Sequence, residues 1–221
     1  MAIKQYNFEI VYNHDQVDFI EYLKPLVGKQ WDKSLKTMGK RHGSGAERDR
    51  LKRFIRKELK DNQGDNCAFC GLSLKTRETH IEHIVPKGEG LYPQFMFEPK
   101  NLILACSLCN GFQKKKTYNT IKIYNDVYNV CKFKIVHPYF DNPDDHYEYI
   151  NDPETNMNVI IRPKIISGVE SIKAKTSIDL FELKDSGMVE ARASEILVSE
   201  KKLEVAKENL LKQVLNRPYI S

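Results

Sequence analysis

The stretch from residue 101 to residue 110 reads NLILACSLCN and joins an apolar run to a C-x-x-C pair. A second such pair, CAFC, occupies residues 67–70. Four thiolates from two C-x-x-C pairs form the ligand set of a closed, tetrahedral zinc site. In a reducing compartment such pairs indicate a metal site rather than disulfides. We therefore predict one structural zinc ion, bound by Cys67, Cys70, Cys106 and Cys109.

The segment between the two cysteine pairs is too long for a compact zinc finger and should fold as an insertion held by the metal. Residues 79–85 read THIEHIV, a β-prone run that predicts a short strand. Residues 101–106 predict a second strand, and the segment from Asn110 to about Thr117 is expected to begin a helix. The local order is therefore strand, long loop, strand and helix.

Polar side chains in this segment suit phosphodiester hydrolysis. The first strand carries His80, Glu82 and His83, whereas Asn101 and Asn110 bracket the second strand and the second cysteine pair. Hydrolysis of a phosphodiester needs a base that activates water and a hard cation that stabilises negative charge. A histidine can be the base, and oxygen ligands from Glu or Asn suit Mg²⁺ or Mn²⁺.

These residues and their order resemble the HNH endonucleases, which have a ββα-metal fold. Glu82-His83, Asn101 and Asn110 occupy the positions of that family's motif, and the zinc-knuckle subgroup frames the motif with two C-x-x-C pairs. The phrase NLILACSLCNGFQKKK is close to that subgroup's NL-x-x-x-C-x-x-CN-x-x-K. The resemblance implies an α+β chain, with a small ββα-metal (HNH) core and a four-cysteine zinc knuckle flanked by N-terminal and C-terminal helices.

The resemblance also implies a role for each matched residue. His83 would be the general base, and Glu82 and Asn110 would bind the catalytic divalent cation. Asn101 would hold the loop and orient His83 through the backbone. Lys114 lies four residues after Asn110, on the same face of the expected helix, and could touch a phosphate.

The first strand leaves one ambiguity about the cation ligands. On a regular strand, residues 82 and 83 face opposite sides, whereas residues 80 and 82 share a side. Either the strand is distorted at its end, or His80 rather than its neighbour approaches the metal. The family's helix position is often His and here is Asn, which favours hard cations.

Basic residues are concentrated near the middle of the chain. There are 35 Lys plus Arg against 30 Asp plus Glu, a net charge of +5 that permits a polyanionic partner without requiring one. Residues 47–59 have apolar positions at helical spacing and predict an amphipathic helix with a basic outer face. That face either contacts nucleic acid or is simply solvated. The predicted nucleic-acid contacts are Arg53, Arg56, Lys57, Lys87, Lys114, Lys115 and Lys116.

A narrower resemblance concerns the flanking segments. CAFCG, IEHIVPKG, a YP-x-x-x-F segment and NPDD at 142–145 are similar to the HNH nucleases of Septu-type and retron-associated anti-phage systems. That resemblance implies an ATPase partner of the ABC or SMC-like kind. The C-terminal helical region or the basic N-terminal region would then be the docking surface.

Composition bounds the remaining possibilities. No run approaches 18 uncharged apolar residues, and the N-terminus does not resemble a secretory signal, so we expect a cytoplasmic protein without a membrane span.

We expect an N-terminal helical region at 1–60, a nuclease core at 61–120 and a loop-rich and helical region at 121–221, packed as one unit. A strand is expected at 159–163, an ordered loop at 137–149 and a helical tail at 171–216.

Two other functions stay open on the sequence. One is a catalytically silent zinc-knuckle module that binds nucleic acid or protein, and the other is a stand-alone restriction-type nuclease. Intact Glu82, His83 and Asn110 argue against the first, and the lack of a target-recognition segment argues against the second. RNA is an alternative to DNA as substrate, although no aromatic stacking platform is evident.

Overall fold

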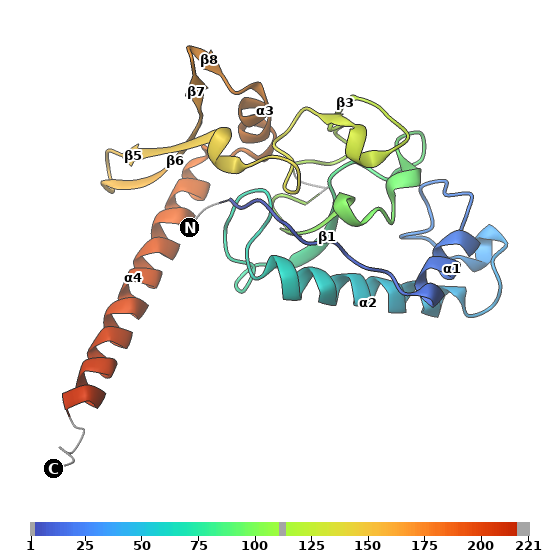
Figure 1. Cartoon of the computed structure of the whole chain (residues 1–221), viewed down its shortest axis with the longest axis horizontal. Coiled ribbons are helices and arrows are strands. Elements are labelled where there is room, and N and C mark those ends of the chain that lie inside the picture. Colours follow the sequence, from blue (N-terminus) through green and yellow to red (C-terminus); the bar gives the residue numbers. More distant parts are fainter. Residues whose placement is uncertain (1–2, 111–113, 216–221) are drawn as a thin grey trace.

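The protein folds as a mixture of helices and short antiparallel hairpins. The structure, a computed structural model, describes residues 3–110 and 114–215 (Figure 1). Its α-helices are α1 (His14–Tyr22), α2 (Ser44–Gln63), α3 (Ile172–Phe181) and α4 (Ser186–Leu215). Its strands are β1 (Thr79–His83), β2 (Leu102–Cys106), β3 (Ile121–Ile123), β4 (Lys132–Phe133), β5 (Tyr147–Asp152), β6 (Met157–Pro163), β7 (Ile165–Ile166) and β8 (Val169–Glu170).

Helix α2 is the predicted basic helix, and it extends beyond the predicted 47–59 at both ends. Leu51, Ile55 and Leu59 are buried at the spacing of one helix face, which packs against β2. The helix ends at Gly64, whose positive φ of 80° closes the last turn. Because this apolar face is buried, the rotation of α2 about its axis is fixed, and with it the direction in which each basic side chain of the helix points.

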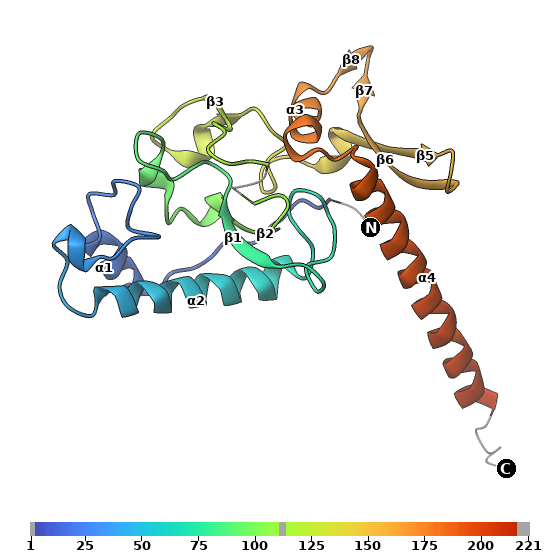
Figure 2. The same ribbon diagram turned by 180° about the vertical axis from the view of Figure 1, so that it is seen from behind.

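Strands β1 and β2 form the predicted hairpin, which lies across α2 (Figure 2). Thr79 pairs with Cys106 at one end, and His83 pairs with Leu102 at the other. The side chain of Gln63, at the end of α2, accepts from the amide of Leu104 at 2.8 Å and donates to its carbonyl at 2.7 Å. This pair of hydrogen bonds ties the helix to the middle of β2.

The helix expected after Asn110 falls partly on residues 111–113, which lie outside the described residues. Asn110 itself forms a bend and residues 114–117 form a turn. The described residues of this segment therefore do not form a helix, and the position of Lys115 is set by a turn instead.

The second half of the chain adds three hairpins and two helices. The strand expected at 159–163 is confirmed as β6, but part of the expected loop at 137–149 is strand β5, which pairs with β6. Helix α3 packs on β6. One cluster of buried apolar side chains runs from Ile3 to Met188 and joins the N-terminal strand-like segment, the β1–β2 hairpin and α3.

Helix α4 is packed at its start and projects away from the rest of the chain beyond it (Figure 1). Arg192 is buried and donates to the carbonyls of Val159 and Leu183. Glu195 pairs with Arg77 and accepts from the amide of Ser73. The described side chains from residue 197 onward are exposed. None of the helices in the described part of the chain has the length and apolar character needed to span a membrane.

Candidate functional site

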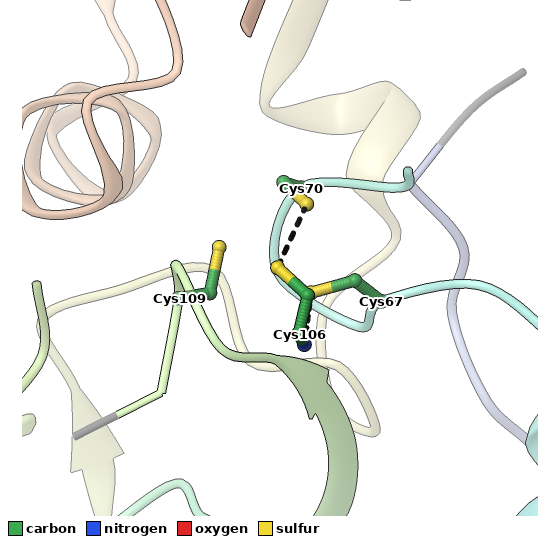
Figure 3. A group of neighbouring side chains, drawn as sticks. All are labelled: Cys67, Cys70, Cys106 and Cys109. Carbon is green, nitrogen blue, oxygen red and sulfur yellow. Dashed lines mark hydrogen bonds between the residues drawn. The ribbon is translucent and has the colours of Figure 1, made fainter. Parts of the chain in front are cut away.

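The four cysteines of the two C-x-x-C motifs come together at one end of the β1–β2 hairpin (Figure 3). Their sulfur atoms all lie within 4.8 Å of one another, and the Sγ atoms of Cys70 and Cys106 are 3.9 Å apart. Tetrahedral zinc with Zn–S bonds of about 2.3 Å places its sulfur ligands roughly 3.8 Å apart. The cluster is therefore compatible with a structural zinc ion, and four buried thiols leave no position for substrate.

Tight turns bring the cysteines into this arrangement. The Gly71 amide donates to the Cys67 carbonyl at 2.9 Å, and Gly71 adopts the left-handed region with φ of 75°. The Asn110 amide donates to the Cys106 carbonyl, also at 2.9 Å. Hydrogen bonds from the neighbouring thiols, that of Cys109 first, lower the pKa of Cys106 and favour its thiolate form.

A cleft of about 680 Å³ lies beside β1, between that strand and α2. Four separate segments contribute side chains to it. Its lining residues are Trp31, Asp32, Lys52, Arg56, His80, Ile81, Glu82, His83, Pro86, Lys87, Gly88, Asn110, Lys115, Lys116 and Thr117. The predicted base and all three candidate cation ligands therefore line one cavity.

His83 is buried in the wall of this cleft, with 4% of its surface exposed. Burial lowers its pKa well below the ordinary value, and the nearby Lys87 adds to the effect. The imidazole is therefore neutral at pH 7. Its Nε2 lies 2.9 Å from the carbonyl oxygen of Met96, which can only accept a hydrogen bond, so Nε2 carries the hydrogen and Nδ1 holds the free lone pair. A neutral imidazole of this kind can act as a base.

Trp31 fixes the ring of His83 from the side of α2. The two rings meet edge to face, with centroids 4.6 Å apart and planes at 85°. Lys52 lies over the same indole at 4.8 Å and donates to the Trp31 carbonyl. Neither Trp31 nor Lys52 was predicted as a site residue. The spacing of Lys52 four residues before Arg56 was the available signal.

Glu82 offers the carboxylate of the candidate cation site. It is 8% exposed, and its Oε1 accepts from the Nζ of Lys115 at 2.8 Å. Asn110 adds an amide oxygen and His80, which is partly exposed, adds an imidazole. One carboxylate with one amide oxygen fits a hard divalent cation that keeps several waters. β1 is a regular strand up to its last residue, so residues 82 and 83 face opposite sides of it. Because residues 80, 82 and 83 all line the cleft, the cleft extends around the end of the strand to both of its sides.

Asn101 holds the long loop between β1 and β2. Its Oδ1 accepts from the Val85 amide at 2.6 Å, and its Nδ2 donates to the carbonyls of Val85 and Phe95. Its own carbonyl accepts from the amide of Ile84, the residue after His83. These bonds are consistent with the predicted role of Asn101 in orienting His83 through the backbone.

A buried network behind Asn101 was not predicted. The Tyr128 hydroxyl lies 3.0 Å from the Asn101 Oδ1 and 3.0 Å from the His137 Nε2. The His137 Nδ1 accepts from the Tyr139 amide, so Nε2 carries the proton and donates to Tyr128, which in turn donates to Asn101. Burial lowers the pKa of His137 to about 3, which keeps this chain of donors intact at pH 7.

The predicted nucleic-acid contacts divide into two groups. Arg56, Lys87, Lys115 and Lys116 line the cleft. Exposed Arg53 and Lys57 do not, and Lys57 pairs with Asp61. Lys114 also lies elsewhere: its ammonium donates to the Phe181 carbonyl at 2.9 Å and pairs with Glu182. These contacts tie its turn to the end of α3, and the predicted phosphate contact of Lys114 stays a prediction.

Comparison with known proteins bears on the segment that supplies the cysteine cluster and most of the cleft residues. Residues 67–116 match the HNH endonuclease family model. A stretch of 134 residues, 60% of this chain, is 26% identical to Septu protein PtuB from Bacillus thuringiensis and covers 42% of that protein. A stretch of 80 residues, 36% of this chain, is 29% identical to Protein ea31 from Escherichia phage lambda and covers 23% of it. The matches thus span less than half the length of either relative.

The family match includes both cysteine pairs, both strands of the hairpin and the cleft residues from His80 to Lys116. It confirms the predicted resemblance to HNH endonucleases, with an α+β fold and a four-cysteine cluster compatible with zinc. The similarity to PtuB supports the narrower resemblance to the Septu type. Residues 67–116, called the HNH segment below, thus match the HNH endonuclease family over the cysteine cluster and most of the cleft.

Proposed function

We propose that this protein is a metal-dependent endonuclease that hydrolyses phosphodiester bonds in DNA. The observation that carries the proposal is the cleft beside β1, where a neutral imidazole, a carboxylate and an amide line one cavity within the HNH segment. This combination supplies a base for water and oxygen ligands for a hard cation.

In this mechanism His83 takes the proton of the attacking water on its Nδ1. The Met96 carbonyl holds the opposite ring nitrogen, and Trp31 holds the ring plane, so the lone pair keeps one direction. Glu82 and Asn110, with His80 as a further candidate, would hold a Mg²⁺ or Mn²⁺ ion. When bound, that ion would stabilise the charge on the scissile phosphate and the departing oxygen.

The charge of the cleft supports a phosphodiester substrate. Five of its lining side chains are basic and two are acidic, so the walls carry a formal charge of 5 − 2 = +3. The basic ones are Lys52, Arg56, Lys87, Lys115 and Lys116, and the acidic ones are Asp32 and Glu82. Such a surface attracts the DNA backbone without reading its bases.

We further propose that the protein is the nuclease effector of a prokaryotic anti-phage system and works with an ATPase partner of the ABC or SMC-like kind. The similarity to Septu protein PtuB supports the defence role. The exposed, projecting half of α4 supports contact with another protein, because apolar side chains such as Leu197, Val198 and Leu203 have no cover there among the described residues.

Supercoiled plasmid incubated with the zinc-loaded protein tests the proposed activity. We expect nicking or linearisation in Mg²⁺ or Mn²⁺, none after the divalent cation is removed, and none with Glu82→Ala or Asn110→Ala. If the protein is inactive alone, the same assay with the co-expressed partner applies. Divalent-ion binding, measured with and without DNA, that persists unchanged in both variants would remove Glu82 and Asn110 as ligands. Binding that is absent from the wild type even in the presence of DNA would favour a silent zinc-knuckle module.

A further inference from the structure

Lys115 has an unusual position for the middle lysine of a KKK run. It is 1% exposed and is one of the largest fully buried side chains in the described part of the chain. Its Nζ donates to Glu82 Oε1 at 2.8 Å, across 33 residues of sequence. Its two neighbours differ: Lys114 pairs at the end of α3, and Lys116 is exposed.

The pairing of Lys115 has a physical consequence for any cation that binds Glu82. Burying an ammonium is costly unless a carboxylate compensates it, and the buried carboxylate has the same need. A divalent cation on Glu82 would meet the ammonium at close range and would be repelled by it. Glu82 can therefore bind the cation well only if the ammonium moves away.

The displaced ammonium would need another anion. Lys115 lines the same cleft as the candidate base and cation ligands, and a phosphodiester entering that cleft is the anion it would meet. A phosphate oxygen accepts a hydrogen bond from an ammonium group as readily as a carboxylate oxygen does. A four-carbon side chain on a turn can exchange one partner for the other without moving β1.

We propose that Lys115 is the built-in counter-ion of Glu82, and that it passes from Glu82 to a substrate phosphate when the divalent cation binds. Lys115 thereby makes metal binding depend on DNA. The inference rests on the proposed function, because it takes Glu82 as a ligand of the divalent cation. It assigns to Lys115 a substrate-binding role that links DNA binding to metal binding.

Mn²⁺ binding, followed by the electron paramagnetic resonance signal of the free ion, tests this inference. The parent protein for this test is zinc-loaded and carries His83→Ala so that DNA stays intact. It is titrated with Mn²⁺ in the absence and in the presence of a short DNA duplex. We expect Lys115→Met to bind Mn²⁺ about tenfold more tightly than its parent when DNA is absent, since the competing charge is gone. We also expect DNA to tighten Mn²⁺ binding in the parent, and to do so far less in Lys115→Met.

Lys116→Met is the matched control, since it removes the same charge from the same cleft without touching Glu82. It should change Mn²⁺ binding without DNA much less than Lys115→Met does. Because Lys115→Met leaves a buried carboxylate unpaired, Lys115→Gln is the second variant, which keeps a hydrogen-bond donor. Its thermal stability as a function of Mn²⁺ concentration gives the affinity independently.

The outcomes separate this inference from the proposed function. Equal or weaker Mn²⁺ binding in Lys115→Met and Lys115→Gln, with binding lost in Glu82→Gln, would overturn the counter-ion role and leave the metal site in place. An equal effect of DNA on Mn²⁺ binding in parent and variant would overturn the link to substrate. Absence of Mn²⁺ binding in every variant, with and without DNA, would overturn the metal site and the inference together.

Discussion

The two ends of the β1–β2 hairpin carry two different kinds of site. At the end where Thr79 pairs with Cys106, four buried cysteine thiols lie within 4.8 Å of one another and leave no room for a substrate. At the end where His83 pairs with Leu102, unlike donors line an open, positively charged cleft. A closed set of identical soft ligands suits a structural metal, whereas mixed ligands with room for water suit chemistry.

The two sites also differ in how they are assembled. The knuckle needs only two tight turns and the end of one strand. The cleft takes side chains from around residues 31–32, 52–56, 80–88 and 110–117, which meet only when α2 is packed on the hairpin. The knuckle should therefore govern whether the segment folds, and the cleft should tolerate substitutions that leave the fold intact.

Loss of one knuckle ligand should have the largest effect on stability. Cys106→Ser should abolish zinc binding and lower the free energy of unfolding by about 5 kcal/mol, which corresponds to a fall in Tm of about 10–20 °C for a domain of this size. Zinc content by metal analysis and thermal unfolding by circular dichroism measure both effects.

Cys131→Ser is the matched control, because Cys131 is equally buried but lies outside the cluster and donates to the Asn125 carbonyl, as a serine could. Its zinc content should equal that of the wild type. If both variants lose the same stability and neither changes zinc content, the difference between the two ends of the hairpin disappears.

The residues of the knuckle are predictable from the sequence more completely than those of the cleft, for a physical reason. Spacing alone identifies the cysteine pairs, helical periodicity predicts α2, and short β-prone or apolar runs predict β1 and β2, because each of these signals depends on neighbours in sequence. The burial of Lys115 and the approach of Trp31 to His83 depend on packing between distant segments. A lysine in a KKK run is ordinarily solvated, so nothing local marks Lys115 as buried.

The missed strand β5 has a similar explanation. Tyr147–Asp152 carries charged and polar residues and follows an Asn-Pro turn, so its sequence is typical of a loop. Its pairing with β6 and the packing of α3 on that hairpin impose the strand.

The cleft end should also be the more acid-sensitive one, through His137. Its pKa is about 3 in the folded protein and about 6.5 in an unfolded chain, so the unfolded state binds more protons between those pH values. Stability should therefore fall as pH drops below about 6.5, by up to ~1.4 kcal/mol per pH unit from this residue. Urea unfolding at pH 7.5 and pH 5 should differ by about 2 kcal/mol more in the wild type than in His137→Gln.

His42→Gln serves as the control for this measurement, because His42 is exposed. It should leave the pH dependence of stability as it is in the wild type. If His137→Gln kept the full pH dependence of the free energy of unfolding seen in the wild type, neutral His137 would not stabilise the cleft end of the hairpin.

The smallest expected effect concerns the two basic faces of α2. Lys52 and Arg56 line the cleft, whereas Arg53 and Lys57 are exposed and do not line it. Replacing the first pair by Gln should weaken DNA binding about tenfold and reduce the slope of log K against log salt by up to about two. Fluorescence anisotropy with labelled DNA at several salt concentrations, without divalent cation, measures this.

The Arg53→Gln/Lys57→Gln pair removes the same charge from the same helix and should have a clearly smaller effect. Equal losses in the two double variants would mean that α2 attracts DNA by its overall charge. The cleft would then have no special part in binding.

The central claim, that His83 activates water in this cleft, is tested most directly by plasmid cleavage with His83→Ala. A positioned general base contributes about 10²- to 10⁴-fold, so we expect cleavage to fall by at least about 100-fold. The variant should keep the zinc content of the wild type, because His83 lies at the end of the hairpin away from the cysteines. It should stay folded with a lower Tm, because His83 is buried against Trp31 and bonded to Met96. Cleavage at the wild-type rate by a folded, zinc-loaded His83→Ala protein would contradict the claim.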